Sequence, residues 1–125
     1  MTPDVDATIE EYRRRYSARD VEGVTDLCLE PFLAIRRGEA IHLTDREAVR
    51  DHFANAIIAY RLSNDVVGWR SVEMDTRPLG EKSVFVTVHW NALDSSNELV
   101  RDTWTSYQLL ESAEGWRFLS YTNHF

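Results

Sequence analysis

Hydrophobic and polar positions divide the chain into two parts. From Val66 to Phe125 the pattern is typical of four long strands in a row, and the residues before Val66 read mostly as three amphipathic helices. Helices followed by a run of strands predict an α+β fold, with three N-terminal helices packed on one face of a curved antiparallel sheet. In that layout a curved sheet can hold a small-molecule pocket under the helices.

The helical part begins at Thr2, a candidate cap that is followed by proline and an acid. One face of this first helix is apolar and carries Val5, Ile9, Tyr12 and Tyr16. Asp20 is expected to cap a short second helix that Pro31 ends. The inner face of that helix is predicted to hold Val24, Leu27 and Cys28.

Two short strands and a third helix complete the first half. Residues Phe32–Ile35 and Ala40–Leu43 are predicted to pair across a turn near Arg37 and Gly38. Thr44 and Glu47 then have the spacing of a capping box, and Asn64-Asp65 closes the helix that it opens. The apolar stripe of this third helix contains Val49, Phe53, Ala56, Ile57 and Tyr60.

The polar turns between the last strands predict their register. If Asp94 faces Asn97, then Trp90 faces Arg101 and His89 faces Asp102. A slip of one residue would exchange the two faces of the sheet.

The last turn, at residues 112–115, is expected to set Glu111 opposite Trp116. Thr105 then faces Thr122, and Thr103 faces His124.

One face of this predicted sheet changes character along its length. Val84, Val86, Leu109 and Phe118 make one end apolar, whereas the other end is polar. A packed core would not hold arginine and histidine without partners, so we expect a pocket that is open at the polar end. The side chains that we predict to line it are Tyr16, Trp90, Arg101, Thr103, Thr105, Tyr107, Thr122 and His124.

Composition narrows the class of protein. The chain has 125 residues, which predicts a single domain over residues 1–125, and its net charge is −7. Its one basic run, Arg13 to Arg15, suits the end of the first helix, so we expect no nucleic-acid partner. Cys28 is the single cysteine, and no apolar stretch reaches the length of a membrane span, which favours a cytoplasmic protein. The histidines lack metal-site spacing, and we expect no cofactor.

The layout resembles the nuclear-transport-factor-2-like superfamily over essentially the whole chain. The local signals are Ala18-Arg19-Asp20 before Gly23, Gly38 before the helix that opens at Thr44, and the strand start Gly115-Trp116. The resemblance implies a cone-shaped α+β domain with a pocket, often as a homodimer. Members include ketosteroid isomerase, SnoaL-like cyclases, scytalone dehydratase, limonene epoxide hydrolase and non-catalytic binders.

The residues that known members use are largely missing. The hairpin position that holds the base in ketosteroid isomerase falls near Arg36-Arg37, and the aspartate position falls near Thr105. Limonene epoxide hydrolase needs carboxylates and an arginine in one pocket, whereas Arg101 and Asp102 are neighbours that point to opposite faces. Fold analogy therefore selects no activity.

Two functions remain open. The first is binding of a small, partly apolar ligand with a polar or anionic end, with cofactor-independent isomerase, dehydratase or cyclase chemistry in which His124 moves a proton and Arg101 holds the anion. The alternative is a non-catalytic binding or dimerisation module. If the opposite face is concave, the pair His89 and Asp102 becomes the catalytic candidate.

The outer face of the sheet is predicted to be covered by a second copy of the chain. Four aromatic residues that we expect to be exposed support this homodimer: Trp69, Trp104, Tyr121 and Phe125.

Overall fold

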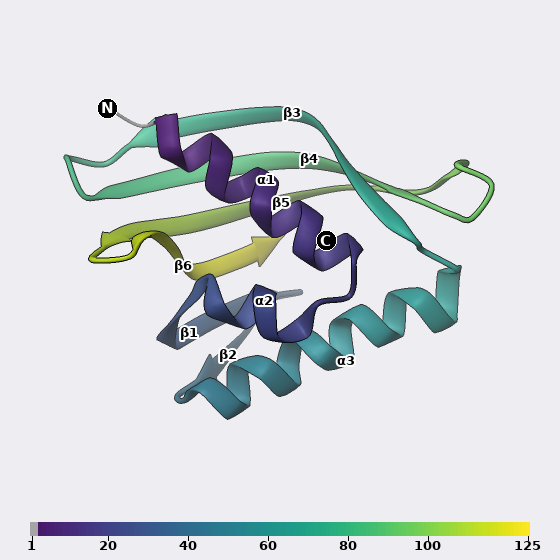
Figure 1. Ribbon diagram of the computed structural model, residues 1–125, viewed down its shortest axis with the longest axis horizontal. Coiled ribbons are helices and arrows are strands. Elements are labelled where there is room, and N and C mark those ends of the chain that lie inside the picture. The colour runs from purple at the N-terminus through teal and green to yellow at the C-terminus, as the bar shows by residue number, and fades with distance from the viewer. Residues whose placement is uncertain (1–2) are drawn as a thin grey trace.

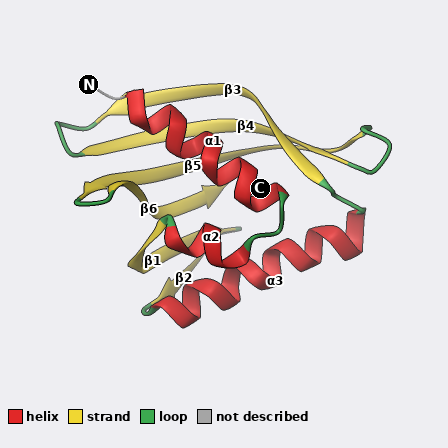
Figure 2. Cartoon of the chain, in the orientation of Figure 1, coloured by secondary structure: helices red, strands yellow, loops and turns green. Residues whose placement is uncertain are grey.

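The computed structural model describes residues 3–125, with helices before the long strands (Figures 1 and 2). The helices are α1 (Pro3–Ser17), α2 (Val21–Asp26) and α3 (Arg46–Asn64). The strands are β1 (Cys28–Arg36), β2 (Glu39–Leu43), β3 (Gly68–Pro78), β4 (Ser83–Leu93), β5 (Leu99–Ser112) and β6 (Gly115–Asn123). This order confirms the predicted α+β class. The predicted cap at Thr2 lies outside the described residues.

Side-chain caps begin the second and third helices. Asp20 accepts a hydrogen bond from the Gly23 amide, as predicted. At α3 the cap is Asp45, which accepts from the Ala48 amide at 2.9 Å, and the prediction of Thr44 was one residue early. Both oxygens satisfy amides that the first turn of a helix leaves free.

The second helix is shorter than predicted. It ends at Asp26, and Cys28 already belongs to β1, which contains Pro31. Proline has no amide hydrogen to donate, and it lies where the pairing of β1 with β6 is irregular, between Cys28 and Leu33.

The six strands form one sheet in the order β2-β1-β6-β5-β4-β3. Neighbouring strands are antiparallel except β1 and β6, which run parallel, so the sheet is mixed. The helices cover one face: α1 packs against β3 and β6, and α3 packs against β1 and β2 (Figure 1). β3 bends strongly, and its pairing with β4 shifts between Ser71 and Glu73 (Figure 1). We call the helix-covered face the inner face.

The predicted register of β4 and β5 is displaced by two residues. Trp90 pairs with Thr103, and His89 pairs with Trp104. The loop is longer than expected, because the Asp94 amide donates to the Glu98 carbonyl, and a further irregularity follows beside Leu93. A shift of two residues leaves every side chain on its predicted face.

The register of β5 and β6 is correct near the turn and wrong beyond it. Leu109 pairs with Phe118 as predicted, but Gln108 pairs with Ser120, so Leu119 is an extra residue in β6. This β-bulge reverses the alternation of everything that follows. Tyr121 and Asn123 therefore reach the inner face instead of Thr122 and His124.

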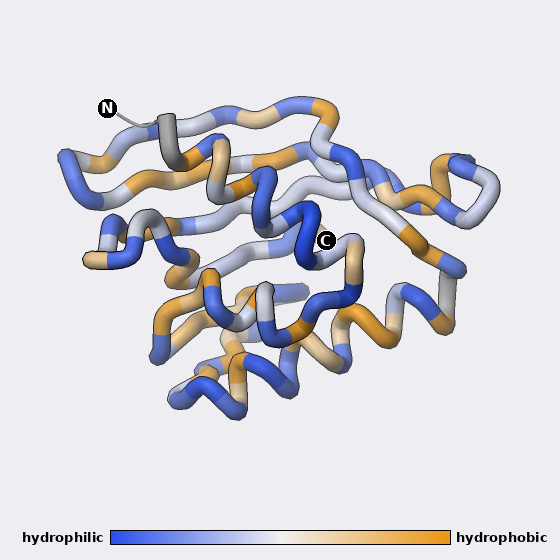
Figure 3. Tube along the Cα trace, in the orientation of Figure 1, coloured by the Kyte–Doolittle hydropathy of each residue, from blue (hydrophilic) through white to orange (hydrophobic). Residues whose placement is uncertain are grey.

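The core lies between the inner face and the helices. Val84, Val86 and Val88 are fully buried there, and burial alternates along β4, whose hydrophobic residues are orange in Figure 3. Each Å² of apolar surface that is buried in this layer stabilises the fold by about 25 cal/mol, so the layer is the main source of stability. Among the described residues, no helix has the length and apolarity needed to cross a membrane.

Candidate functional site

A cavity of about 220 Å³ lies between the inner face of the sheet and helices α1 and α3. Aromatic and arginine side chains dominate its wall. The lining residues are Tyr12, Arg13, Tyr16, Arg36, Arg37, Phe53, Ala56, Ala59, Tyr60, Trp69, Trp90, Arg101, Thr103, Thr105, Tyr107, Tyr121, Asn123 and Phe125. None of these described residues is an aspartate, glutamate or histidine. The wall is thus cationic in a chain whose net charge is −7.

The floor of the cavity is a cluster of aromatic rings centred on Tyr12. The centroid of its ring lies 5.6 Å from that of Tyr107 and 4.8 Å from that of Phe118. The Trp90 indole Nε1 donates a hydrogen bond to the Tyr107 hydroxyl at 2.9 Å. Burial raises the pKa of Tyr107, so its hydroxyl remains protonated. The floor is rigid, apolar in bulk and suited to a flat ring.

Arg101 lies on the wall without an ion-pair partner among the described residues. Its guanidinium carbon lies 5.5 Å from the centroid of Tyr60 and 4.7 Å from that of Phe125. Its Nε is buried and has no hydrogen-bond partner. A buried donor without an acceptor is unfavourable by about 1–3 kcal/mol, so the position of Arg101 costs stability in the free protein.

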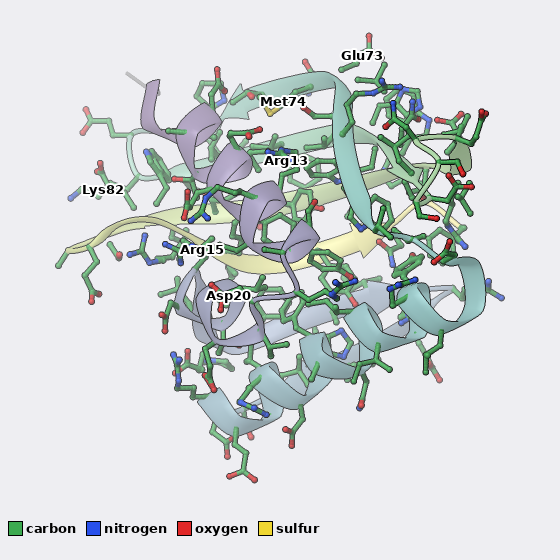
Figure 4. All side chains as sticks on the ribbon, turned by 45° about the vertical axis from the view of Figure 1, so that its right-hand side comes forward. Arg13, Arg15, Asp20, Glu73, Met74 and Lys82 are labelled. Carbon is green, nitrogen blue, oxygen red and sulfur yellow. The ribbon has the colours of Figure 1, made fainter. Side chains whose placement is uncertain are left out.

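The other arginines differ in how far they are neutralised. Arg13 reaches from α1 toward β3, pairs with Glu10 at 2.6 Å and donates to the Trp69 carbonyl (Figure 4). Arg37 stacks over Phe125 at 5.4 Å. Within the described part of the chain, neither Arg36 nor Arg37 has a carboxylate within ion-pair distance. Among the described residues, Arg36, Arg37 and Arg101 therefore have no carboxylate partner.

A histidine lies directly behind the wall. The Nε2 of His52, on α3, is 2.6 Å from the hydroxyl of Tyr121, on β6. Burial, and secondarily the Arg36 charge, lower the pKa of His52. Burial raises the pKa of Tyr121, and Arg36 opposes that shift. The resting pair is consequently a neutral imidazole and a protonated phenol.

Most of the residues predicted for the pocket lie on its wall. Those that line the cavity are Tyr16, Trp90, Arg101, Thr103, Thr105 and Tyr107. The cavity is open, and Trp90 and Tyr107 bond to each other on its wall instead of plugging it. Whether these side chains bind a ligand remains a prediction.

The predicted inward placement of Thr122 and His124 is wrong. The bulge at Leu119 places both on the outer face, where His124 Nε2 lies 2.8 Å from the Ser106 hydroxyl. His124 and Arg101 thus do not converge. Asn123 takes the predicted place of Thr122 and accepts a hydrogen bond from Thr105 at 3.1 Å.

The second predicted pair lies on the outer face. His89 bonds to Asp102, and its ring stacks on Trp104 with centroids 4.1 Å apart and planes at 9°. The expected direct pairing of His89 with Asp102 was wrong, since they meet diagonally across neighbouring strands. The pair does not line the cavity, because it lies on the opposite face of the sheet.

Several site residues escaped the sequence interpretation. Tyr121 and Phe125 were expected on the outer face, and Trp69 was expected to be exposed, but all three line the cavity. His52 was assigned only to the flank of its helix. The apolar residue Phe53, which directly follows His52, was a weak signal that this histidine is partly buried. The contact of His52 with Tyr121 depends on tertiary packing.

The structure offers no evident metal centre in the region it describes. No group of three histidine, cysteine or carboxylate side chains converges among residues 3–125. Cys28 is buried, and burial raises the pKa of its thiol, which disfavours the thiolate.

Solved structures share this fold at low sequence identity. An NTF2-like protein with a cystatin-like fold from Novosphingobium aromaticivorans has a TM-score of 0.74 and 15% identity, over 95% of this chain and 77% of that chain. A proposed dehydratase of the NTF2-like family from Streptomyces avermitilis has a TM-score of 0.72 and 15% identity, over 98% of this chain and 96% of that chain.

A proposed aromatic ring hydroxylase, also from Novosphingobium aromaticivorans, has a TM-score of 0.73 and 11% identity, over 97% of this chain and 85% of that chain. At these identities the likeness shows the fold alone. A comparison with curated proteins found no match. A family model described as NTF2-like protein (DUF6841) matches residues 3–125, and the chain therefore belongs to this NTF2-like family.

Proposed function

We propose that the chain binds a small aromatic carboxylate in the cavity. The observation that carries this proposal is the wall itself, which combines a floor of aromatic rings with three arginines that lack carboxylate partners among the described residues. An aryl group would stack on the Tyr12 cluster, and a carboxylate would pair with the guanidinium of Arg101, which lines the cavity.

The size of the cavity agrees with such a ligand. Its volume of about 220 Å³ admits a single ring with a short acidic side chain but not a large polycyclic molecule. An anionic end on the ligand would also complement the arginines of the cavity wall, which is cationic although the chain as a whole is acidic. A carboxylate would enter against the net charge but into a local positive potential.

The direct test compares an anionic ligand with a neutral ligand of similar shape. Phenylacetate and phenylacetamide have nearly the same shape, and titration calorimetry measures each dissociation constant. We expect phenylacetate to bind at least tenfold more tightly, because about 1.4 kcal/mol of charge-assisted hydrogen bonding corresponds to that ratio. Equal affinities would show that the arginines do not bind the carboxylate. No binding of either compound would refute the proposal.

Acid–base chemistry on the bound ligand is a second proposed function. The supporting observation is the 2.6 Å contact between His52 and Tyr121 at the cavity wall. Isomerisation, dehydration and cyclisation each need a group that moves a proton beside a carbonyl, and this pair can do so without a cofactor. The non-catalytic alternative predicts binding with no turnover of any carbonyl compound.

We further propose that the chain forms a homodimer through the outer face of β4 and β5. Phe85 is 41% exposed and Trp104 is 39% exposed on that face, and neighbouring strand residues add apolar surface. A second copy would bury both rings on the same patch of each protomer.

A further inference from the structure

The Tyr121 hydroxyl is distinguished by its position between the cavity and an imidazole. Tyr121 lines the cavity, whereas His52 lies behind it on α3, half-buried, with Nε2 at 2.6 Å from the hydroxyl. The floor tyrosines have different partners: Tyr107 accepts from the Trp90 indole. Among the described side chains of the wall, Tyr121 is thus the phenol with a proton acceptor directly behind it.

We propose that Tyr121 and His52 form a proton relay that exchanges a proton at the carbon next to the carbonyl of an aryl 2-oxo acid. This inference rests on the proposed binding of aromatic carboxylates and names the substrate class for that cavity. An aryl 2-oxo acid supplies the ring, the carboxylate and an acidic C–H bond in one molecule. The aromatic floor, the free guanidinium groups and the relay each match one of these parts.

The step balances within the cavity. The Tyr121 oxygen takes the proton from C3 of the substrate while the Tyr121 hydroxyl proton passes to His52 Nε2. The C3–H electron pair forms the C=C bond of the enolate, and the carbonyl π pair moves to oxygen. The new Tyr121 hydroxyl proton exchanges with water in the cavity, which Tyr121 lines. The reverse steps then return a solvent-derived proton to C3, so the net reaction is exchange, and no oxidant or reductant is required.

The arginine charges favour the enolate that this transfer forms, whereas burial and Arg36 disfavour the imidazolium on His52. The substrate gains one negative charge as His52 gains one positive charge, and Arg36 and Arg101 lie on the wall that faces the new enolate. Tyr121 therefore acts as the catalytic residue, while His52 positions its hydroxyl and receives the displaced proton.

The relay requires a neutral imidazole. The groups that act on His52 are Arg36 from β1 and the Tyr121 hydroxyl from β6, and burial together with Arg36 lowers the pKa of the imidazole. The acidic side chains of α2, which also packs on α3, are instead paired with Arg46 and Arg50. Among the described groups of β2, none contributes to the shift. The exchange rate should fall at acidic pH as His52 becomes protonated.

Proton NMR in D₂O tests the relay with phenylpyruvate as the probe. The wild-type chain is expected to accelerate loss of the C3 proton signal above the buffer rate. Tyr121→Phe keeps the ring and removes the hydroxyl, so the enzymatic rate should fall by about 100-fold or more. His52→Gln should lower the rate by about tenfold or more and abolish the fall at acidic pH. His42→Gln, at an exposed position of β2, is the matched control and should keep the wild-type rate and profile.

Each result decides a separate point. Buffer-level exchange by the wild type, with phenylpyruvate binding shown by calorimetry, overturns the relay and leaves the proposed binding function standing. Failure of both phenylpyruvate and phenylacetate to bind overturns both. A full rate in Tyr121→Phe removes the tyrosine from the step, and an unchanged acid limb in His52→Gln removes the histidine. Thermal unfolding of each variant identifies a folding defect. If Tyr121→Phe fails to fold, His52→Gln still tests the relay, because the side chain of His52 is only half-buried.

Discussion

Replacing Arg101 by methionine separates a binding role from a structural one. Methionine keeps an unbranched apolar stem in the same place and removes the guanidinium. The Arg101 Nε is buried without an acceptor, and the group stacks over Tyr60 and Phe125. The substitution therefore removes one unfavourable and two favourable interactions from the free protein.

The two contributions nearly cancel. Relief of the unsatisfied donor is worth about 1–3 kcal/mol of stability. Loss of two cation–π contacts, at 5.5 and 4.7 Å, removes about 0.5–1 kcal/mol each. We expect the free energy of unfolding to change by no more than about 2 kcal/mol, because the difference between the two contributions runs from about −1 to about +2 kcal/mol. Binding of phenylacetate should weaken by about 2 kcal/mol, roughly thirtyfold, because a charge-assisted hydrogen bond is lost.

Urea unfolding followed by tryptophan fluorescence measures the first quantity, and titration calorimetry measures the second. Arg77→Met is the control, since Arg77 lies exposed on β3 and outside the cavity wall. A loss of 3 kcal/mol or more in stability with unchanged phenylacetate affinity would show that Arg101 holds the fold together and does not bind the anion.

Three further outcomes are expected. Trp104→Glu should turn a dimer into a monomer in light scattering, and a wild type that is monomeric at about 50 μM would contradict the proposed interface. Tyr12→Ala should lower the free energy of unfolding by about 3–5 kcal/mol in urea, because a buried ring at the centre of the floor is removed; a loss below 1 kcal/mol would contradict that packing. Arg14 first, and then Arg15, lower the pKa of Glu11 from 4.5 to about 2. Since the folded value lies below the unfolded one, this stabilisation is present above pH 4.5 and is lost as the pH falls toward 2. Glu11→Gln should flatten the stability profile in that window, and an unchanged slope would contradict the pairing.

Two errors of register had different consequences for the site. In β4 and β5 the longer loop and the following irregularity each contribute one residue, and the shift of two leaves Trp90, Thr103 and Arg101 on the predicted face. In β6 the single extra residue, Leu119, reverses the face. His124 was lost from the site and Tyr121 was gained for that reason alone.

The bulge in β6 lies beside contacts with a distant part of the chain. At this point β6 also bonds to the start of β1, where Phe118 donates from its amide to the Leu27 carbonyl at 2.8 Å. Pairing of β1 is irregular over the same segment. The bulge thus coincides with contacts to a parallel neighbour from a distant part of the chain, which no turn signal in the sequence reports.

The sequence by itself determined the order of helices and strands, the faces of β4 and β5, and the presence of Trp90, Arg101 and Tyr107 on the pocket wall. It could do so because hydrophobic periodicity and caps such as Asp20 act over a few neighbouring residues. Tertiary structure alone decided which end of β6 faces inward, that Arg101 Nε lacks a partner, and that His52 meets Tyr121. These features arise from contacts between residues that are distant in the chain. A change of one residue in strand pairing moves a side chain to the other face of the sheet and so removes such a contact.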